Sequence, residues 1–276
     1  MIIVHALASR LSIFSGLAAV FCYVLSNISS TSRPLTLQNF KMKPLQVVIL
    51  AGGLGTRLRP ITSKIPKVMV EIGDKPFLQY QFEYLKNQGF NDFLLLLSYL
   101  GEQVENYFQD GKQLKINIQY AYEPEPMGTG GALKLAQNKI REEFLLLNGD
   151  TFCPLDYPDF LHKARGISEG GMIAVYKNWE PIAENNMRLE EGGLISAYSK
   201  AKETKEMNGV DGGIAYYRRT VLNAIPADKK ISFEDEIYPQ LIKKKVLWGY
   251  FTNTRYYDMG TFERLEIAKK ALSHDY

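Results

Sequence analysis

Three short apolar runs constrain the fold of this 276-residue chain most strongly, because each stops abruptly at glycine or a polar residue. They occupy residues 46–50, 93–97 and 143–147. Continuous apolar runs of this length are typical of buried parallel strands. Between and beside them, apolar periodicity predicts helices at 77–88, 102–108 and 131–138 and a further strand at 116–122. The β-α-β-α-β order predicts an α/β fold with a mainly parallel sheet and right-handed crossovers.

The pattern changes after Asp150. Short, closely spaced strands separated by glycines are expected at 172–176, 187–190, 194–198 and 213–217. Their spacing predicts antiparallel additions to the sheet, followed by helices at 233–243 and 262–272. With no composition break after residue 42, we expect one domain over 42–276.

Residues 1–41 form a distinct N-terminal extension. An apolar run at 11–25 follows Arg10, and residues 30–41 are predicted to form a polar linker. Three interpretations stay open: a membrane tether within residues 1–28, a cleaved signal segment, or an extension upstream of a natural start at Met42. Because the net charge of +3 resides entirely in this extension, the remainder is neutral. A neutral domain gives no footprint for nucleic acid, and two cysteines give no disulfide framework.

A glycine-rich turn follows the first strand, in Leu50-Ala-Gly-Gly-Leu-Gly-Thr-Arg-Leu58. It is neither a Walker A loop nor a dinucleotide fingerprint, since the Gly-Lys-Ser/Thr and the third glycine are missing. Glycines let backbone N–H groups approach phosphate oxygens closely. Arg57 adds a planar cation, and Lys67 in a following loop adds a second. Together they predict a phosphate site at the strand end rather than a plain turn.

Two aspartates are candidates for a metal site. Asp150 follows the apolar run 143–147, and Asp258 stands in a turn closed by Gly260. Two hard oxygen ligands completed by phosphate oxygens suit Mg²⁺, although aspartate is also the commonest turn residue. None of the three histidines lies in a candidate site.

Several segments resemble the sugar-1-phosphate nucleotidyltransferase family, and the resemblance covers roughly residues 44–271. The matching segments are LAGGLGTRLRP at 50–60, IPKVM at 65–69, GDKPF at 73–77, MGTGG at 127–131, NGD at 148–150 and YDMGT at 257–261. The resemblance implies a Rossmann-like, GT-A-like catalytic domain. It also implies the reaction of a nucleoside triphosphate with a sugar 1-phosphate to give an NDP-sugar and pyrophosphate.

The resemblance also implies residue roles. Arg57 and Lys67 would be catalytic, and Asp150 and Asp258 would hold one Mg²⁺. Residues expected to bind nucleotide are Leu50, Ala51, Gly52, Gly53, Gly55, Thr56, Glu123 and Gly128. Residues expected to bind the sugar phosphate are Lys200, Asp211, Gly149 and Asn186.

The sugar site departs from the family pattern. Many relatives have Glu-Lys-Pro where this chain has Ser199-Lys200-Ala201, so Lys202 is an alternative to Lys200. Asp211 stands where an asparagine is common; because a carboxylate accepts but does not donate, it would read a different hydroxyl pattern. Asn186 is equally compatible with a plain β-turn.

The nucleotide base is predicted from Glu123. A carboxylate can accept hydrogen bonds from the adjacent N1–H and N2–H₂ donors of guanine, which favours GTP; Glu125 could serve equally. Segments 75–80, 99–103 and 127–131 are similar to those of D-glycero-D-manno-heptose 1-phosphate guanylyltransferases, with mannose 1-phosphate enzymes second.

The leading hypothesis is therefore a Mg²⁺-dependent guanylyltransferase acting on a heptose or mannose-type sugar 1-phosphate. The alternatives are a uridylyl-, thymidylyl- or cytidylyltransferase of the same family, or a non-catalytic sugar-nucleotide-binding regulatory subunit. Because these substrates are cytoplasmic, the catalytic domain is expected in the cytoplasm, with any membrane contact made through the extension. A homo-oligomer is compatible with the sequence.

Overall fold

The computed structural model describes residues 45–200 and 205–275. The chain divides into two units, residues 1–43 and 44–276. The predicted extension at 1–41 lies outside the described residues, as does Lys202. Among the helices that are described, none has the length and apolar character needed to cross a bilayer.

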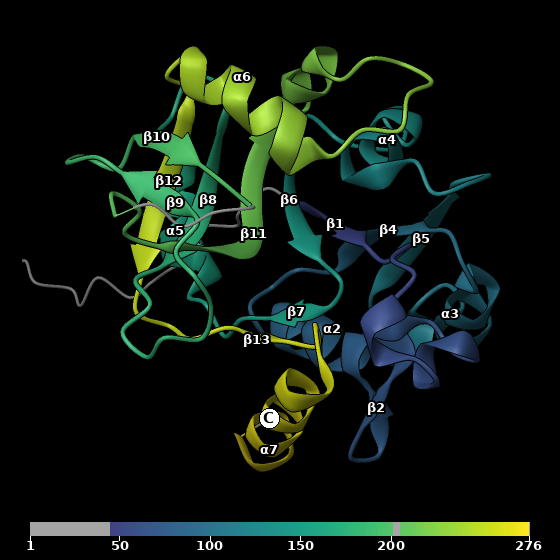
Figure 1. The fold of residues 1–276 in the computed structure, drawn as a ribbon. Helices are drawn as coiled ribbons and strands as arrows, with labels where there is room; N and C mark the ends of the chain where they lie inside the picture. The colour runs from purple at the N-terminus through teal and green to yellow at the C-terminus, as the bar shows by residue number, and fades with distance from the viewer. Residues whose placement is uncertain (1–44, 201–204, 276) are drawn as a thin grey trace, which may run out of the picture. The chain divides into compact units, whose positions relative to one another are not determined.

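A seven-stranded sheet forms the centre of the described unit, in the order β12-β8-β11-β6-β1-β4-β5 (Figure 1). The bounds are β1 Gln46–Leu50, β4 Asp92–Leu97, β5 Asn117–Tyr122, β6 Glu143–Asn148, β8 Gly171–Tyr176, β11 Val210–Arg218 and β12 Leu247–Thr252. Within this sheet β11 is antiparallel to both its neighbours, and the other pairs are parallel. The mainly parallel α/β fold is confirmed.

The strand order places a topological switch between β1 and β6. The chain goes from β1 outward to β4 and β5, then returns to lay β6 on the other side of β1. In open α/β sheets the crevice at such a point, beside the carboxyl ends of the strands, receives the ligand. Here those ends are Leu50 and Asn148, which are register partners.

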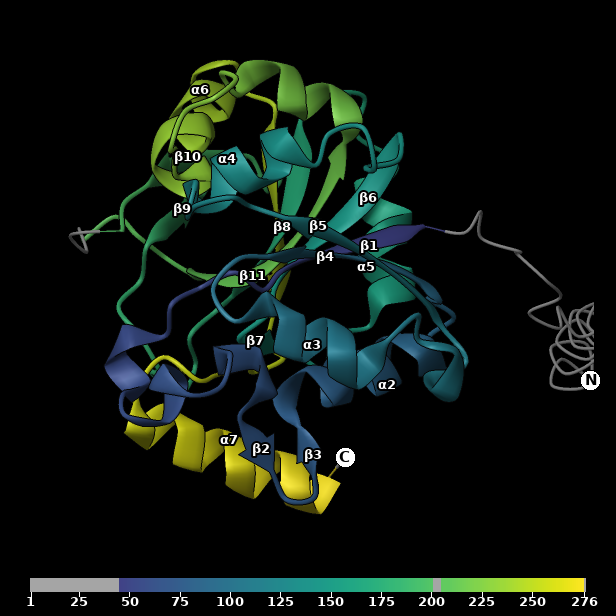
Figure 2. The same cartoon turned by 90° about the vertical axis from the view of Figure 1, so that its right-hand side faces the viewer.

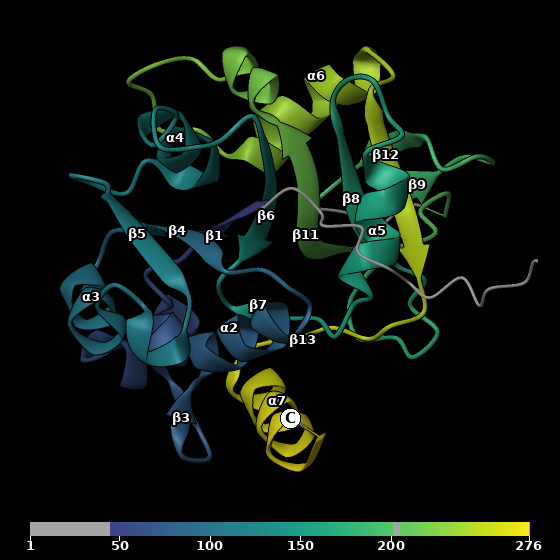
Figure 3. The same cartoon turned by 180° about the vertical axis from the view of Figure 1, so that it is seen from behind.

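Helices cover both faces of the sheet (Figure 2). On one face lie α4 and α6, and on the other α2, α3 and α5. The reverse view shows α5 in front of the sheet near β8 (Figure 3). The bounds are α2 Phe77–Asn87, α3 Gly101–Phe108, α4 Gly128–Leu135, α5 Tyr157–Ala164, α6 Tyr238–Lys243 and α7 Phe262–Asp275. Because both faces are covered, β1 and β4 are apolar along most of their length.

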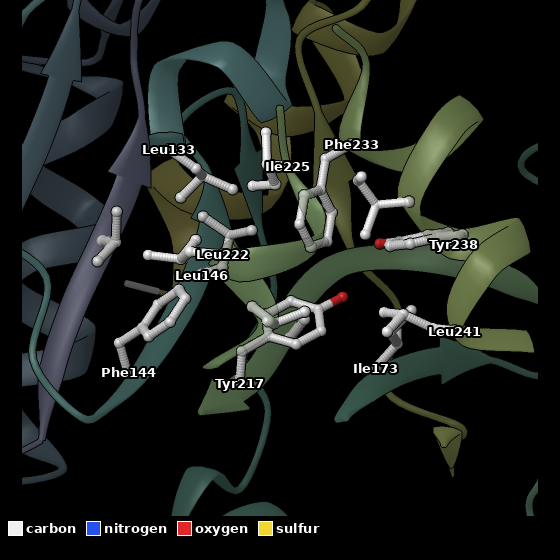
Figure 4. Close-up of a cluster of buried hydrophobic side chains, with 14 of the residues drawn as sticks. Leu133, Phe144, Leu146, Ile173, Tyr217, Leu222, Ile225, Phe233, Tyr238 and Leu241 are labelled. Carbon is white, nitrogen blue, oxygen red and sulfur yellow. The ribbon is translucent and has the colours of Figure 1, made fainter. Parts of the chain in front are cut away.

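The core on the α4 and α6 side is rich in aromatic side chains (Figure 4). Tyr217 of β11 packs edge-on against Phe233, which contacts Tyr238 in the same way. A second cluster around Phe77, Phe152 and Met259 joins α2 to α7. This second cluster fixes the chain segment that carries Asp258.

Small sheets complete the unit. β7 (Thr151–Phe152) pairs antiparallel with β13 (Tyr257–Asp258), beyond the end of β6 and beside α7 (Figure 1). β2 (Glu71–Ile72) pairs with β3 (Lys75–Pro76). β9 (Met187–Leu189) pairs with β10 (Ile195–Tyr198).

The strand expectations after Asp150 need a correction. Strands at 187–190 and 194–198 exist, but they form their own two-stranded sheet instead of joining the central one. The helix expected at 233–243 is divided into a π-helical turn, η6 (Phe233–Ile237), and α6. The helix expected at 131–138 begins three residues earlier, at Gly128.

Candidate active site

The glycine-rich turn after β1 passes across the carboxyl edge of the sheet. Gly55 has φ +59°, a left-handed conformation that glycine adopts without strain. Its carbonyl accepts a hydrogen bond from the Thr62 hydroxyl at 2.7 Å, which pins the turn. The next residues form a short 3₁₀ helix, η1 (Thr56–Leu58), whose Leu58 is fully buried and so anchors the exposed Arg57.

This turn forms one wall of a cavity of about 350 Å³ at the switch point. The other walls come from the end of β6, the start of α4 and the region of Lys200 and Glu234. Predicted site residues in the lining are Leu50, Ala51, Gly52, Gly53, Lys67, Glu123, Gly128, Asp150 and Lys200. The volume is within the range of small-ligand sites.

A smaller cavity of about 190 Å³ adjoins the first, with which it shares Gly53, Lys67 and Asp150. Its remaining lining residues are Gly55, Thr56, Arg57 and Gly260. Two cations, a carboxylate and glycine backbone therefore meet in one recess. Such a set of groups suits a polyphosphate chain.

Lys67 and Asp150 are in direct contact. The ammonium Nζ donates to Asp150 Oδ2 at 2.5 Å, and the Lys67 side chain is 10% exposed while that of Asp150 is 36% exposed. Lys67 begins the 3₁₀ turn η3 (Lys67–Met69), whose Val68 is buried in the core. The buried η3 turn therefore fixes the backbone of Lys67, and its side chain lines both cavities.

Asp258 reaches the same region from the far end of the chain. In the β7–β13 pair it is the register partner of Thr151, and the Met259 N–H donates to the Asp150 carbonyl at 3.0 Å. A Cβ on Gly260 would lie 2.6 Å from Asp258 Oδ1 and 3.5 Å from an Nη of Arg57. Asp258 Oδ1 and an Nη of Arg57 therefore lie on either side of Gly260, but Asp258 lines neither of the two cavities and instead lines a neighbouring pocket with Arg264.

The donor set at this point fits a hard divalent cation. The two carboxylates supply oxygen ligands, and no group of three or more His, Cys, Asp or Glu side chains that could hold a metal occurs among the described residues. Magnesium commonly uses one or two carboxylates and takes its remaining ligands from phosphate and water. The oxygen chemistry of Asp150 and Asp258 is therefore of the kind that suits magnesium.

Glu123 lies at the other end of the larger cavity. Its Oε2 accepts a hydrogen bond from the Met127 N–H at 2.7 Å. A Cβ on Gly52 would be 2.8 Å from the second oxygen, Oε1, so the carboxylate lies directly against the glycine-rich turn. Burial raises the pKa of Glu123, partly offset by the hydrogen bond from Met127. Glu125 is not among the lining residues.

Gly128 opens α4 with φ +74°, and a Cβ there would come within 2.5 Å of the Ile231 carbonyl oxygen. The tight approach brings α4 against the segment that leads into η6. Thr129 Oγ1 donates to Glu234 Oε2 at 2.7 Å and accepts from the Phe233 N–H at 2.8 Å. These hydrogen bonds join the start of α4 to η6, and Thr129 and Glu234 both line the larger cavity.

The predicted sugar-site residues are only partly brought together. Lys200 lines the large cavity, with its Nζ 3.8 Å from Asp235 Oδ2. Asn186 Oδ1 accepts from the Asp211 N–H at 2.9 Å, so these two residues are neighbours, but neither lines that cavity. Gly149 is buried behind the turn, and its N–H donates to the Leu50 carbonyl at 2.9 Å. The structure thus places Gly149 in the scaffold and not on the cavity wall.

Four polar residues near the site were not predicted. Asn148, Thr129 and Glu234 line the cavity, and Arg264 contacts Asp258. Asn148 had a signal, since it ends an apolar strand beside Asp150. Glu234 and Arg264 had none, because they sit on helical segments that only tertiary packing brings to the sheet edge.

A mainly parallel sheet that carries a glycine-rich turn, two cations and a carboxylate at its switch point is typical of enzymes that bind nucleotides. The chain belongs to the nucleotidyl transferase family, whose sequence profile matches residues 46–274. This match confirms the predicted family and enzyme class.

Individual relatives carry more specific names. The chain is 37% identical over 202 residues to D-glycero-alpha-D-manno-heptose 1-phosphate guanylyltransferase of Campylobacter jejuni, covering 73% of this chain and 88% of that one. It is 32% identical to mannose-1-phosphate guanyltransferase of Saccharomyces cerevisiae, spanning 77% of this chain and 60% of that longer enzyme. Among solved structures, HddC from Yersinia pseudotuberculosis complexed with GMP-PN matches with a TM-score of 0.71 at 30% identity, covering 83% of this chain and 99% of that one.

Proposed function

We propose that this protein transfers GMP from GTP to a heptose or mannose-type sugar 1-phosphate, releasing pyrophosphate. The observation that carries the proposal is the convergence of Arg57, Lys67 and Asp150 on one recess beside the nucleotide-sized cavity. The names of the similar guanylyltransferases support the choice of substrates.

The reaction needs positioning and charge compensation more than acid–base chemistry. A phosphate oxygen of the sugar 1-phosphate attacks the α-phosphorus of the triphosphate, and the bond to the β-phosphate bridging oxygen breaks, so pyrophosphate leaves with its electron pair. Both partners are anions, so the barrier contains their mutual repulsion. Lys67, held at 10% side-chain exposure between both cavities, places its charge near the reacting phosphorus.

The other residues bind and orient. Backbone N–H groups of the turn at Gly53 and Gly55, together with Arg57, bind the leaving phosphates. Glu123 accepts hydrogen bonds from the guanine edge, while the Met127 N–H fixes the carboxylate in place. Lys200, which lines the larger cavity, would contact the sugar phosphate.

Nucleotidyl transferases generally use a divalent metal ion. Asp150 and Asp258 would hold Mg²⁺, which when bound neutralises negative charge on the phosphates. The chain's own part is to fix these two carboxylates: Asp258 accepts the Gly260 N–H at 2.6 Å, and Asp150 is tied through its backbone to Met259.

Removing both carboxylates tests this assignment. Pyrophosphate release from GTP with mannose 1-phosphate and heptose 1-phosphate should fall at least about 10³-fold in Asp150→Ala/Asp258→Ala. The matched control, Asp228→Ala, removes an exposed carboxylate that does not line the cavities and should leave the rate unchanged. Undiminished release by the double variant would contradict the metal assignment.

Tight GDP-sugar binding by the unmodified protein without turnover would favour the regulatory-subunit alternative.

A further inference from the structure

Trp179, in the loop between β8 and β9, is the most exposed large apolar side chain of the described residues, at 71%. A single exposed apolar side chain is ordinary by itself. What distinguishes Trp179 is that its orientation is fixed, because the indole Nε1–H donates to Asn253 Oδ1 at 2.7 Å. The indole therefore presents a flat apolar face to solvent in a defined position.

The loop that carries Trp179 is ordered by side-chain hydrogen bonds. Asn178 has φ +55°, a left-handed conformation that asparagine tolerates. Its Oδ1 accepts from the Ile182 N–H at 3.1 Å, and its Nδ2 donates to the Ala183 carbonyl at 2.9 Å. From α7, Arg264 Nη2 donates to the Ile182 carbonyl at 3.2 Å. A loop that is already fixed lowers the entropy cost of binding a ligand.

Trp179 faces an open pocket of about 590 Å³. The other lining residues are Tyr176, Glu180, Asn253, Arg255 and Tyr257. This pocket shares no lining residue with either cavity of the candidate active site. Two of its residues, Arg255 and Tyr257, also line the neighbouring pocket that contains Asp258. The Trp179 pocket is therefore a separate recess that lies next to the candidate active site.

The charges in the Trp179 pocket cancel. Among the described residues that line it, Glu180 is the only acid and Arg255 the only base, and Arg255 Nη1 donates to Glu180 Oε2 at 2.6 Å. Lys177 holds its ammonium 5.6 Å from the centre of the Phe251 ring and is not part of the lining. A phosphate would therefore meet no unpaired cation here, which favours a neutral ligand.

The remaining polar groups of the pocket suit hydroxyl groups. Asn253 uses its Oδ1 for the indole and Glu180 uses its Oε2 for Arg255. The amide Nδ2 of Asn253 and the Oε1 of Glu180 have no partner within the described part of the chain. A hydroxyl group both donates and accepts, so it can satisfy either. The negative face of an indole also attracts the polarised C–H groups of a saccharide ring.

We propose that the Trp179 pocket is a binding site for a neutral pyranose, which stacks on Trp179 and hydrogen-bonds to Asn253 and Glu180. A small ligand is favoured over a protein partner, because the free polar groups surround a recess whose volume is that of small-ligand sites. The site lies outside the two active-site cavities, so the proposal does not depend on guanylyl transfer.

The test uses fluorescence of the full chain, whose two tryptophans are Trp179 and the half-buried Trp248. In Trp248→Phe the tryptophan emission comes from Trp179 alone. Methyl α-D-mannopyranoside, a neutral pyranose, should shift this emission to shorter wavelength and saturate, because stacking removes water from the indole. Asn253→Ala in the same background should need at least about fivefold more sugar for half-saturation. The matched control Asn223→Ala removes an exposed asparagine outside the pocket and should leave the titration unchanged.

A second measurement does not depend on Trp248→Phe. Saturation-transfer NMR of methyl α-D-mannopyranoside with the unmodified chain should show transfer to the sugar C–H protons. Trp179→Ala should abolish this transfer, and Trp179→Phe, which keeps a ring, should retain part of it. Tyr107→Ala removes an exposed aromatic ring elsewhere and should match the unmodified chain.

Titrations of the Trp248→Phe chain with GDP-mannose and with GDP distinguish a free pyranose from one carried on a nucleotide. A shift with methyl α-D-mannopyranoside, or one with GDP-mannose that GDP does not produce, supports the proposal and identifies the source. An equal shift with GDP alone would show base stacking and overturn it. Absence of a shift with both sugar ligands, or undiminished NMR transfer in a folded Trp179→Ala chain, would also overturn it. So would a Trp179 emission that changes with protein concentration without sugar, which would indicate a protein–protein interface.

Discussion

At the scale of single residues, the buried carboxyl group of Asp211 has a raised pKa. Its Oδ1 accepts the Gly213 N–H at 2.8 Å and its Oδ2 accepts the Tyr238 hydroxyl at 3.2 Å. Burial nevertheless raises its pKa to about 6, and the charge of Glu234 acts in the same direction. Both carboxylate oxygens already serve the fold, which leaves fewer lone pairs for a sugar hydroxyl.

The raised pKa of Asp211 predicts how stability depends on pH. The folded state binds this proton more tightly than the unfolded state, whose carboxyl has a pKa of 3.8. Its contribution to the free energy of unfolding is therefore largest below about pH 4 and is lost as the pH rises to about 6. Relative to the native protein, Asp211→Asn should gain about 2 kcal/mol of stability between pH 4 and pH 7.

Urea unfolding at the two pH values measures this difference directly. Asp228→Asn changes an exposed carboxyl and should show a pH profile parallel to that of the unmodified protein. A parallel profile for Asp211→Asn as well would mean that its carboxyl titrates normally.

At the scale of elements, the glycines of the site serve two different needs. Gly128 has φ +74° and no room for a Cβ, so the fold itself requires glycine there. Gly53 has neither constraint: its φ is not positive and a Cβ would meet nothing within 4 Å. Because Gly53 lines both cavities, we propose that close approach of a phosphate ligand is the reason for a glycine at this position.

Gly53→Ala should therefore separate binding from folding. We expect its free energy of unfolding to stay within about 1 kcal/mol of the native value. The KM for GTP should rise about tenfold or more, because the methyl group obstructs the approach of phosphate to the backbone N–H groups. Steady-state kinetics and urea unfolding of the same preparation provide both numbers.

Gly166→Ala is the matched control, since it adds the same methyl group at the end of α5, away from both cavities. Its KM for GTP should not change. An unchanged KM in Gly53→Ala would show that the phosphates do not pass over this turn.

The sequence predicts those elements whose identity is set locally. Continuous apolar runs locate β1, β4 and β6, because strands covered on both faces must be apolar throughout. Residues at the ends of these strands, such as Asp150, follow from the same reasoning. β12, a half-buried edge strand containing Gly249, has no such pattern and was not predicted.

What the sequence does not predict depends on contacts between distant segments. Strand spacing does not show whether β9 and β10 pair with each other or join the central sheet, because tertiary packing decides this. Arg264 and Glu234 reach the site because α7 and η6 pack where they do. The placement of Gly149 behind the turn likewise depends on the approach of β6 to Leu50.

At the scale of the whole molecule, the catalytic unit we propose is carried by residues 42–276. Every cavity-lining residue and the family match at 46–274 fall within it. A protein that begins at Met42 should therefore fold and show the kcat and KM of the full chain. Size-exclusion chromatography and the pyrophosphate assay check both points. An insoluble or inactive product would show that the first 41 residues are integral to the fold.

The central claim is guanylyl transfer at the recess formed by Arg57, Lys67 and Asp150. The most direct measurement is pyrophosphate release by the full chain with Mg²⁺, using GTP, UTP, dTTP and CTP against a panel of sugar 1-phosphates. GTP should be preferred by at least about tenfold in kcat/KM, with heptose 1-phosphate or mannose 1-phosphate as acceptor. Preference for UTP, dTTP or CTP would contradict the role of Glu123, and no release with any pair would contradict the claim itself.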